Sequence, residues 1–192
     1  MDKRTKILKA AVQVFAKRGF YNAKVSEIAK RANVAAGTIY LYFKNKDEIL
    51  ISIFEEEMEN IIAEINQSVT NEKNSLKKLE TFIHKHLEFV RKNPALAQVF
   101  QVELRQSNKF IKEYTGSKLK EYLDLLGRIV EEGQKAGMMR DDLHPGLVKR
   151  AVFGALDEIA THWVLAKNGK VDLEESADQV TGLFKHALIK NQ

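Results

Sequence analysis

The residues best suited to a chemical role lie between Val25 and Lys46. Hydroxyl groups occur there at Thr38, Tyr40 and Tyr42, and a lysine follows at the end of the segment. Hydroxyl and ammonium groups are among the side chains that contact the phosphate oxygens of a nucleic acid backbone. We therefore take this segment as a candidate surface for duplex DNA.

The same segment has the spacing of a helix-turn-helix. Ala29 is a small residue where two short helices would cross closely, and Asn33 tolerates the left-handed backbone of a turn. Apolar anchors follow the turn at Val34, Ile39 and Phe43. This pattern leaves the start of the second helix free to enter the major groove.

Small side chains at the start of that second helix allow close approach to base edges and thymine methyl groups. Lys24, just before the first helix of the helix-turn-helix, is placed to reach a phosphate. The alternative is that the two tyrosines are half-buried packing residues. The predicted DNA-contacting set is Lys24, Ser26, Ala35, Ala36, Gly37, Thr38, Tyr40, Tyr42 and Lys46.

The charge distribution agrees with a polyanionic partner. The chain of 192 residues carries a net charge of +5. Residues 1–48 hold 11 Lys and Arg against 4 Asp and Glu, a net +7, so the rest of the chain is slightly acidic. Basic clustering in one small module is typical of nucleic-acid binding, because each neutralised phosphate releases a counterion. A solvated helix face is the alternative.

Composition excludes several other classes of protein. The chain has no cysteine, which rules out a disulfide framework, a thiolate metal site and a thiol nucleophile. It also lacks a run of roughly 20 apolar residues that would span a membrane, and its N-terminus lacks a secretory core. We expect a cytoplasmic protein with no membrane association and no metal site.

The elements that position these residues are predicted to be helices. Apolar residues recur at helical spacing along most of the chain, and no segment alternates as a strand does. The fold class predicted is all-α with about nine helices: a helix-turn-helix domain over residues 1–46 and a helical ligand-binding and dimerisation domain over 47–192. The helices are expected near residues 7–15, 25–32, 36–42, 49–69, 76–90, 94–107, 119–130, 145–167 and 173–188.

The N-terminal motifs carry a family resemblance. The runs Phe15–Phe20 and Gly37–Lys46 resemble the DNA-binding module of the TetR family of one-component repressors. The resemblance implies a three-helix N-terminal domain, phosphate contacts from residues 38, 40, 42 and 46, and a homodimer built mainly on the last two helices. It also implies release from an operator when a ligand binds. The chain departs from the family pattern at Ala23 and Lys24, where Thr is usual, and at Asn33, where Gly is usual.

The long helix expected from residue 145 carries two apolar residues per turn. One stripe would pack inward and the other against a partner, which favours a dimerisation helix. Small residues at Ala151, Gly154 and Ala155 permit close approach of a second chain. The alternative is a single broad core face.

An apolar set on successive core helices is the candidate lining of an effector cavity, and without obvious buried acids it suits a long hydrocarbon. The alternative is that this set is simply core. Its members are Phe82, Phe89, Leu96, Phe100, Leu104, Tyr122, Phe153 and Trp163.

Four segments resemble the fatty-acid-degradation repressors of the TetR family in Gram-positive bacteria. They are residues 37–46, 49–54, 102–108 and 153–158. This resemblance implies a long-chain acyl-CoA effector with no further cofactor. Arg105 is the candidate for a head-group phosphate, with an internal ion pair as its alternative. Asn108 and Lys109 complete the predicted ligand set.

Three other functions are alternatives to a ligand-responsive repressor. They are a repressor of an efflux pump that responds to hydrophobic drugs, a non-specific architectural DNA-binding protein, and an enzyme or carrier of acyl-CoA. The chain has no Gly-rich phosphate loop and no Gly-x-Ser-x-Gly turn, so we predict that it is not an enzyme. Glu80, His84 and Glu88 share one helix face, which more often forms ion pairs than a metal or acid–base site.

Overall fold

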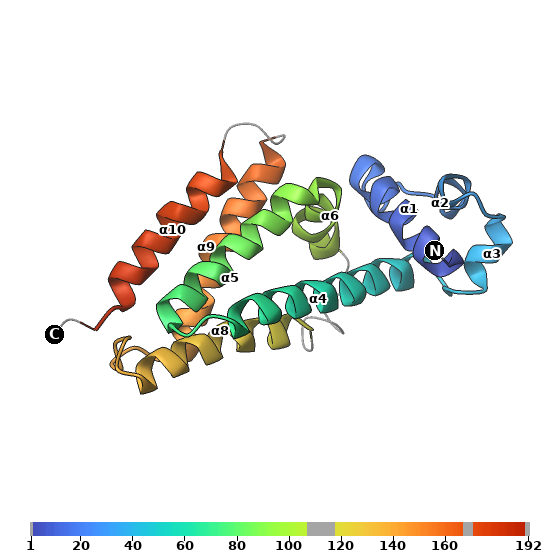
Figure 1. The fold of residues 1–192 in the computed structure, drawn as a ribbon. Coiled ribbons are helices and arrows are strands. Elements are labelled where there is room, and N and C mark those ends of the chain that lie inside the picture. The colour runs from blue at the N-terminus through green and yellow to red at the C-terminus, as the bar shows by residue number, and fades with distance from the viewer. Residues whose placement is uncertain (1, 107–117, 167–170, 191–192) are drawn as a thin grey trace. The chain divides into compact units, whose positions relative to one another are not determined.

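The computed structural model of this chain describes residues 2–106, 118–166 and 171–190. Within these ranges the predicted all-α fold is confirmed, with nine α-helices and one isolated bridge between Met139 and Ile189 (Figure 1). The described elements are α1 (Lys3–Arg18), α2 (Val25–Ala32), α3 (Ala36–Tyr40), α4 (Lys46–Thr70), α5 (Ser75–Lys92), α6 (Pro94–Gln98), η1 (Val99–Glu103), η2 (Leu104–Gln106), α8 (Lys118–Lys135), α9 (Pro145–Leu165) and α10 (Leu173–Leu188).

The chain forms two compact units. The N-terminal unit contains Met1–Met58 and Asn93–Gly116, and the C-terminal unit contains Glu59–Lys92 and Ser117–Gln192. The boundary predicted at residue 46 is the start of α4, whereas the compact units divide within that helix. The reason is packing: α6 and η1 lie against α1, so this later segment belongs with the first helices.

Local signals explain the helix ends of the N-terminal unit. The Asp2 carboxylate accepts a hydrogen bond from the Thr5 backbone N–H at 2.7 Å and so caps α1. Gly19 ends that helix with φ +77°, a conformation that favours glycine. Lys24 provides no side-chain cap for α2; instead Glu27 Oε2 accepts from the Lys24 N–H at 3.1 Å. The predicted left-handed turn residue, Asn33, has φ +55°.

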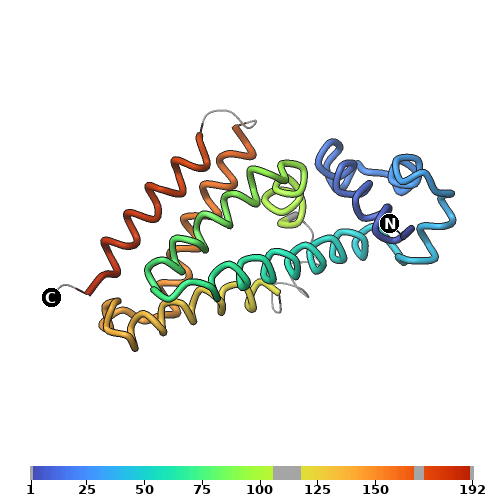
Figure 2. The backbone as a smooth tube through the Cα atoms, in the orientation of Figure 1, coloured from blue at the N-terminus to red at the C-terminus, as the bar shows by residue number. Residues whose placement is uncertain are grey.

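The helix-turn-helix packs around a small apolar core. Ile28 and Ala29 of α2 and Ile39 of α3 are buried, and Phe43 closes the core after α3. Figure 2 shows α2 and α3 as short helical segments joined by a turn. Helix α3 ends at Tyr40 rather than at residue 42, because the next backbone N–H groups bond three residues back, at 3.2 and 3.0 Å.

Four helices make the core of the C-terminal unit. Helix α5 packs against α8, α9 and α10, and Figure 1 shows α5, α9 and α10 side by side. Asp172 caps α10, because its Oδ1 accepts from the N–H groups of Glu174 and Glu175 at 2.8 and 3.2 Å. His144 caps α9 by accepting from the Gly146 N–H at 3.0 Å.

The helix predicted over residues 94–107 changes type along its length. α6 gives way to the π-helix η1, in which the Leu104 N–H bonds to the Val99 carbonyl, and then to the 3-10 turn η2. Single π turns occur frequently at functional sites. No described helix has both the length and the apolar character that a membrane crossing requires.

Candidate functional site

Most of the predicted DNA-contacting residues are exposed in the N-terminal unit. Lys24, Ser26 and the start of α3 are exposed, as are Tyr40 at 59% and Tyr42 at 41%, while Thr38 is half-buried. At Gly37, a Cβ atom would meet no other atom within 4 Å. The surface therefore combines two exposed tyrosines with open space at the first turn of α3. Its contact with DNA stays a prediction.

Lys46 takes a role inside the unit that the sequence did not reveal. Its Nζ donates hydrogen bonds to the carbonyls of Tyr21 and Ala23 at 2.9 and 3.1 Å, and lies 4.7 Å from the centre of the Phe20 ring. A lysine ammonium has three N–H donors. Lys46 therefore fixes the loop between α1 and α2, which positions the helix-turn-helix.

The N-terminal unit holds part of the predicted effector set. Leu96 and Leu104 are buried, and the Phe100 ring lies 5.5 Å from that of Phe54. Arg105 is exposed, and its Nη2 donates to Gln101 Oε1 at 2.9 Å. The predicted ligand residues 108 and 109 lie outside the described residues.

Glu103 is a buried acid that sequence reasoning missed. It is 5% exposed, and its Oε2 accepts a hydrogen bond from the Phe20 backbone N–H at 2.6 Å. The same oxygen would lie 3.5 Å from a Cβ at Gly19. The carboxylate therefore satisfies a buried N–H just beyond α1 and ties η1 to the loop between α1 and α2.

The C-terminal unit brings three predicted effector residues together. Phe82 and Tyr122 are buried with ring centres 5.1 Å apart, and the half-buried Phe153 lies 6.1 Å from Tyr122. Trp163 is also buried, whereas Phe89 is half-buried. Rings from α5, α8 and α9 thus form one aromatic cluster.

His86 stands in the middle of this cluster and was not among the predicted ligand residues. Its ring centre is 6.0 Å from Tyr122 and 6.3 Å from Phe153, and its Nδ1 is 2.6 Å from the Tyr122 hydroxyl. Burial lowers the pKa of His86 to about 4, although the charge of Asp157 acts in the opposite direction. The imidazole is therefore neutral at pH 7.

This lowered pKa predicts a pH-dependent stability. The unfolded chain binds a proton at His86 near the ordinary pKa of about 6.5, while the folded chain does not until about pH 4. This contribution to the free energy of unfolding is fully present above pH 6.5, and about 3 kcal/mol of it is lost as the pH falls from 6.5 to 4. Urea unfolding at several pH values checks it: His86→Leu should remove most of this slope, and an unchanged slope would assign it to other groups.

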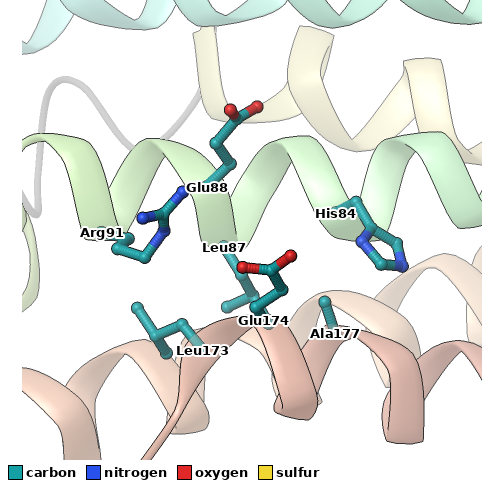
Figure 3. Close-up of a pocket in the computed structure, with 7 residues that line it drawn as sticks. All are labelled: His84, Leu87, Glu88, Arg91, Leu173, Glu174 and Ala177. Atoms are coloured by element: carbon teal, nitrogen blue, oxygen red, sulfur yellow. The ribbon is translucent and has the colours of Figure 1, made fainter.

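A small pocket on the C-terminal unit lies between α5 and α10 (Figure 3). Its volume is about 240 Å³, and it is lined by residues of both helices, among them His84, Glu88 and Arg91. Glu88 pairs with Lys92 and Lys85 at 2.5 and 3.0 Å, and these contacts lower its pKa to about 2.

The ion-pair interpretation of this helix face is confirmed for its two acids. Glu80 pairs with Lys77 and Lys185, and the pKa of its carboxyl is lowered by them. Over the described ranges, no group of three or more His, Asp or Glu is placed to hold a metal ion.

A further exposed face runs along α9 and α10. Leu147 and Leu165 of α9 are 64% exposed, and Leu183 of α10 is 65% exposed. Ala151 and Gly154 lie between the two α9 leucines and are also exposed. Helical spacing places these α9 positions on one stripe. The inner stripe of α9 is buried, so this helix has two apolar faces, as predicted for a dimerisation helix.

Two family models cover most of the chain. The model of bacterial regulatory proteins of the tetR family matches residues 7–53, and that of the C-terminal region of YsiA-like proteins matches residues 54–187. The chain is 40% identical over 178 residues to the fatty acid metabolism regulator protein of Bacillus subtilis, covering 93% of this chain and 91% of that protein.

Two solved structures share the fold over nearly the whole chain. FadR from Bacillus subtilis in complex with stearoyl-CoA matches with a TM-score of 0.88 and 40% identity, covering 93% of this chain and 96% of that one. The fatty acid degradation regulator FadR from Bacillus halodurans matches with a TM-score of 0.91 and 39% identity, covering 96% and 95%.

Proposed function

Since the chain belongs to the TetR family of bacterial transcriptional regulators, we propose that it represses genes of fatty acid degradation. It binds operator DNA as a homodimer and is released by a long-chain acyl-CoA. The observation that carries this proposal is the 40% identity, over 93% of the chain, to a regulator solved with stearoyl-CoA.

The described DNA surface supports operator binding. The exposed start of α3 fits the docking of a recognition helix, whose N-terminal residues contact base edges. The hydroxyls of Tyr40 and Tyr42 are accessible to phosphates. Lys46 holds the loop before α2 through its hydrogen bonds to the carbonyls of that loop. We propose that it contacts a phosphate with the N–H donor that these two bonds leave over.

The aromatic cluster of the C-terminal unit supports an effector with a hydrocarbon chain. Its members are the rings of Phe82, Tyr122 and Phe153. Pockets for apolar ligands are lined mainly by such side chains, with few polar groups. Arg105 is proposed to contact a phosphate of the CoA head group, and unchanged acyl-CoA affinity in Arg105→Ala would remove it from that role.

The exposed face of α9 and α10 supports a homodimer. A two-fold interface uses the same patch on both subunits, and small residues at its centre let two helices approach closely. The two recognition helices of a dimer must lie roughly 34 Å apart to enter successive major grooves. We propose that the effector favours a dimer geometry with another separation, which needs only a few kcal/mol of preference between two states.

The dimer face gives a direct prediction at Gly154. Gly154→Arg should leave the subunit folded, since a Cβ there meets nothing within 4 Å, but should keep a second α9 at a distance. We expect a shift from dimer to monomer in sedimentation velocity and operator binding weakened by about tenfold. Ala136→Arg, also on an exposed site, is the matched control and should remain dimeric. Dimeric Gly154→Arg protein would place the interface elsewhere.

The proposed function is tested with operators selected from random duplex at about 150 mM salt, where non-specific binding is weakened. Stearoyl-CoA should lower operator affinity at least about tenfold, while free CoA and stearate do not. Release by cationic drugs alone would support the efflux-pump alternative. Binding without sequence preference would support the architectural alternative.

A further inference from the structure

One polar atom in the aromatic cluster has no partner among the described residues. His86 Nε2 is closed off from solvent and makes no hydrogen bond there. Buried polar groups in folded proteins are nearly always hydrogen-bonded, so an exception asks for a physical reason. The atom belongs to the ring that contacts Tyr122 and Phe153, and the charge of Asp157 also acts on this imidazole.

The hydrogen bond to Tyr122 sets which His86 nitrogen carries the proton. Tyr122 is 2% exposed, and its hydroxyl lies 2.6 Å from Nδ1. We assign the hydroxyl as the donor and Nδ1 as the acceptor, because a buried hydroxyl that accepted from Nδ1–H would leave its own proton unpaired. A neutral imidazole carries a single proton, which is therefore on Nε2. The unpartnered atom is a hydrogen-bond donor.

The ligand class of the proposed function offers an acceptor that matches this donor. A long-chain acyl thioester is a hydrocarbon that ends in a single carbonyl oxygen. The cluster supplies matching groups, namely aromatic rings for the hydrocarbon and one unused donor at His86. Phe153 is half-buried, so one ring of the cluster is partly accessible from solvent.

We propose that the Nε2–H of His86 donates a hydrogen bond to the thioester carbonyl of the acyl-CoA effector. This inference rests on the proposed function and adds the residue that distinguishes a thioester from other long-chain ligands. The bond forms only when the ligand displaces the side chains that cover Nε2. A contact made in one state alone is what shifts a two-state equilibrium, so the same bond contributes to release from the operator.

The test compares two ligands that differ only at the carbonyl. Stearoyl-CoA carries the thioester, and S-octadecyl-CoA carries a methylene group in its place. Calorimetric titration of the full-length protein should give a Kd for stearoyl-CoA about tenfold lower, because the thioether leaves the buried donor unpaired. His86→Leu should reduce this preference to less than about twofold.

Two further variants make the result specific. His86→Gln places an amide N–H near the position of Nε2 and should restore most of the preference. His84→Leu, on the helix face that points to Asp178 and away from the cluster, is the matched control and should keep it. Thermal melting confirms that each variant is folded.

The outcomes separate the two proposals. A wild-type protein that binds both ligands equally overturns the role of His86 and leaves the proposed function standing. A preference that survives in folded His86→Leu protein also overturns it. A wild-type protein that binds neither ligand overturns the proposed function, and with it the assignment of the thioester as the partner of His86.

Discussion

Gly37→Leu is expected to weaken operator binding by at least about 100-fold while the protein remains fully folded. The site meets no atom within 4 Å of a Cβ, and its backbone is ordinary right-handed helix, so leucine fits the free protein without strain. Leucine is also a better helix former than glycine, by roughly 1 kcal/mol. The loss arises only on DNA, where the start of α3 must approach the base edges closely.

Two measurements separate these effects. Fluorescence anisotropy with a labelled operator gives the change in Kd, and circular dichroism gives the melting temperature, which should be equal or higher. Gly37→Ala is the matched control, since one methyl group should cost about tenfold or less in affinity. Wild-type operator affinity in Gly37→Leu would show that α3 does not enter the groove with its first turn.

Local sequence signals were enough to predict most of the fold. Each helix carries its own apolar stripe, and several ends are set by residues whose effect is confined to one turn. Asn33 in its left-handed turn and Asp172 at its cap are examples. The exposure of Tyr40 follows from the same reasoning, because the turn anchors fix which face of α3 is buried.

The contacts that organise the candidate sites join residues far apart in sequence. Lys46 donates to a carbonyl 25 residues earlier, and His86 meets a tyrosine 36 residues later. Periodicity shows that a position faces inward but does not show which side chain meets it there. His86 was passed over for this reason: no metal-ligand spacing marks it, and its hydrogen-bond partner lies on another helix.

The change of helix type after α6 shows a second limit. An apolar pattern with a period near 3.6 predicts a helix over residues 94–107, and the described part of that segment is helical throughout. Periodicity did not predict the π turn η1 or the 3-10 turn η2 within that segment. Glu103 ends this π turn, and its 5% exposure could not be expected from its charge.

Glu103→Ala is expected to lower the free energy of unfolding of the N-terminal unit by about 3 kcal/mol. It removes an acceptor from the Phe20 N–H, which then stays buried and unpaired, and it leaves a hole where the side chain packed. Urea unfolding followed by circular dichroism reports the loss. The opposite result, a stability within about 0.5 kcal/mol of wild type, would mean that solvent replaces the carboxylate.

Glu103→Gln is the control that separates the loss of the hydrogen-bond acceptor from the loss of side-chain packing. Its amide oxygen still accepts from Phe20, so stability should fall by less than half as much.

The same pair of variants tests how η1 influences DNA binding. Glu103 holds the loop between α1 and α2, and Lys46 holds the carbonyls of Tyr21 and Ala23 on that loop. Because Glu103 and Lys46 both hold this loop, operator affinity should fall in Glu103→Ala and be largely kept in Glu103→Gln.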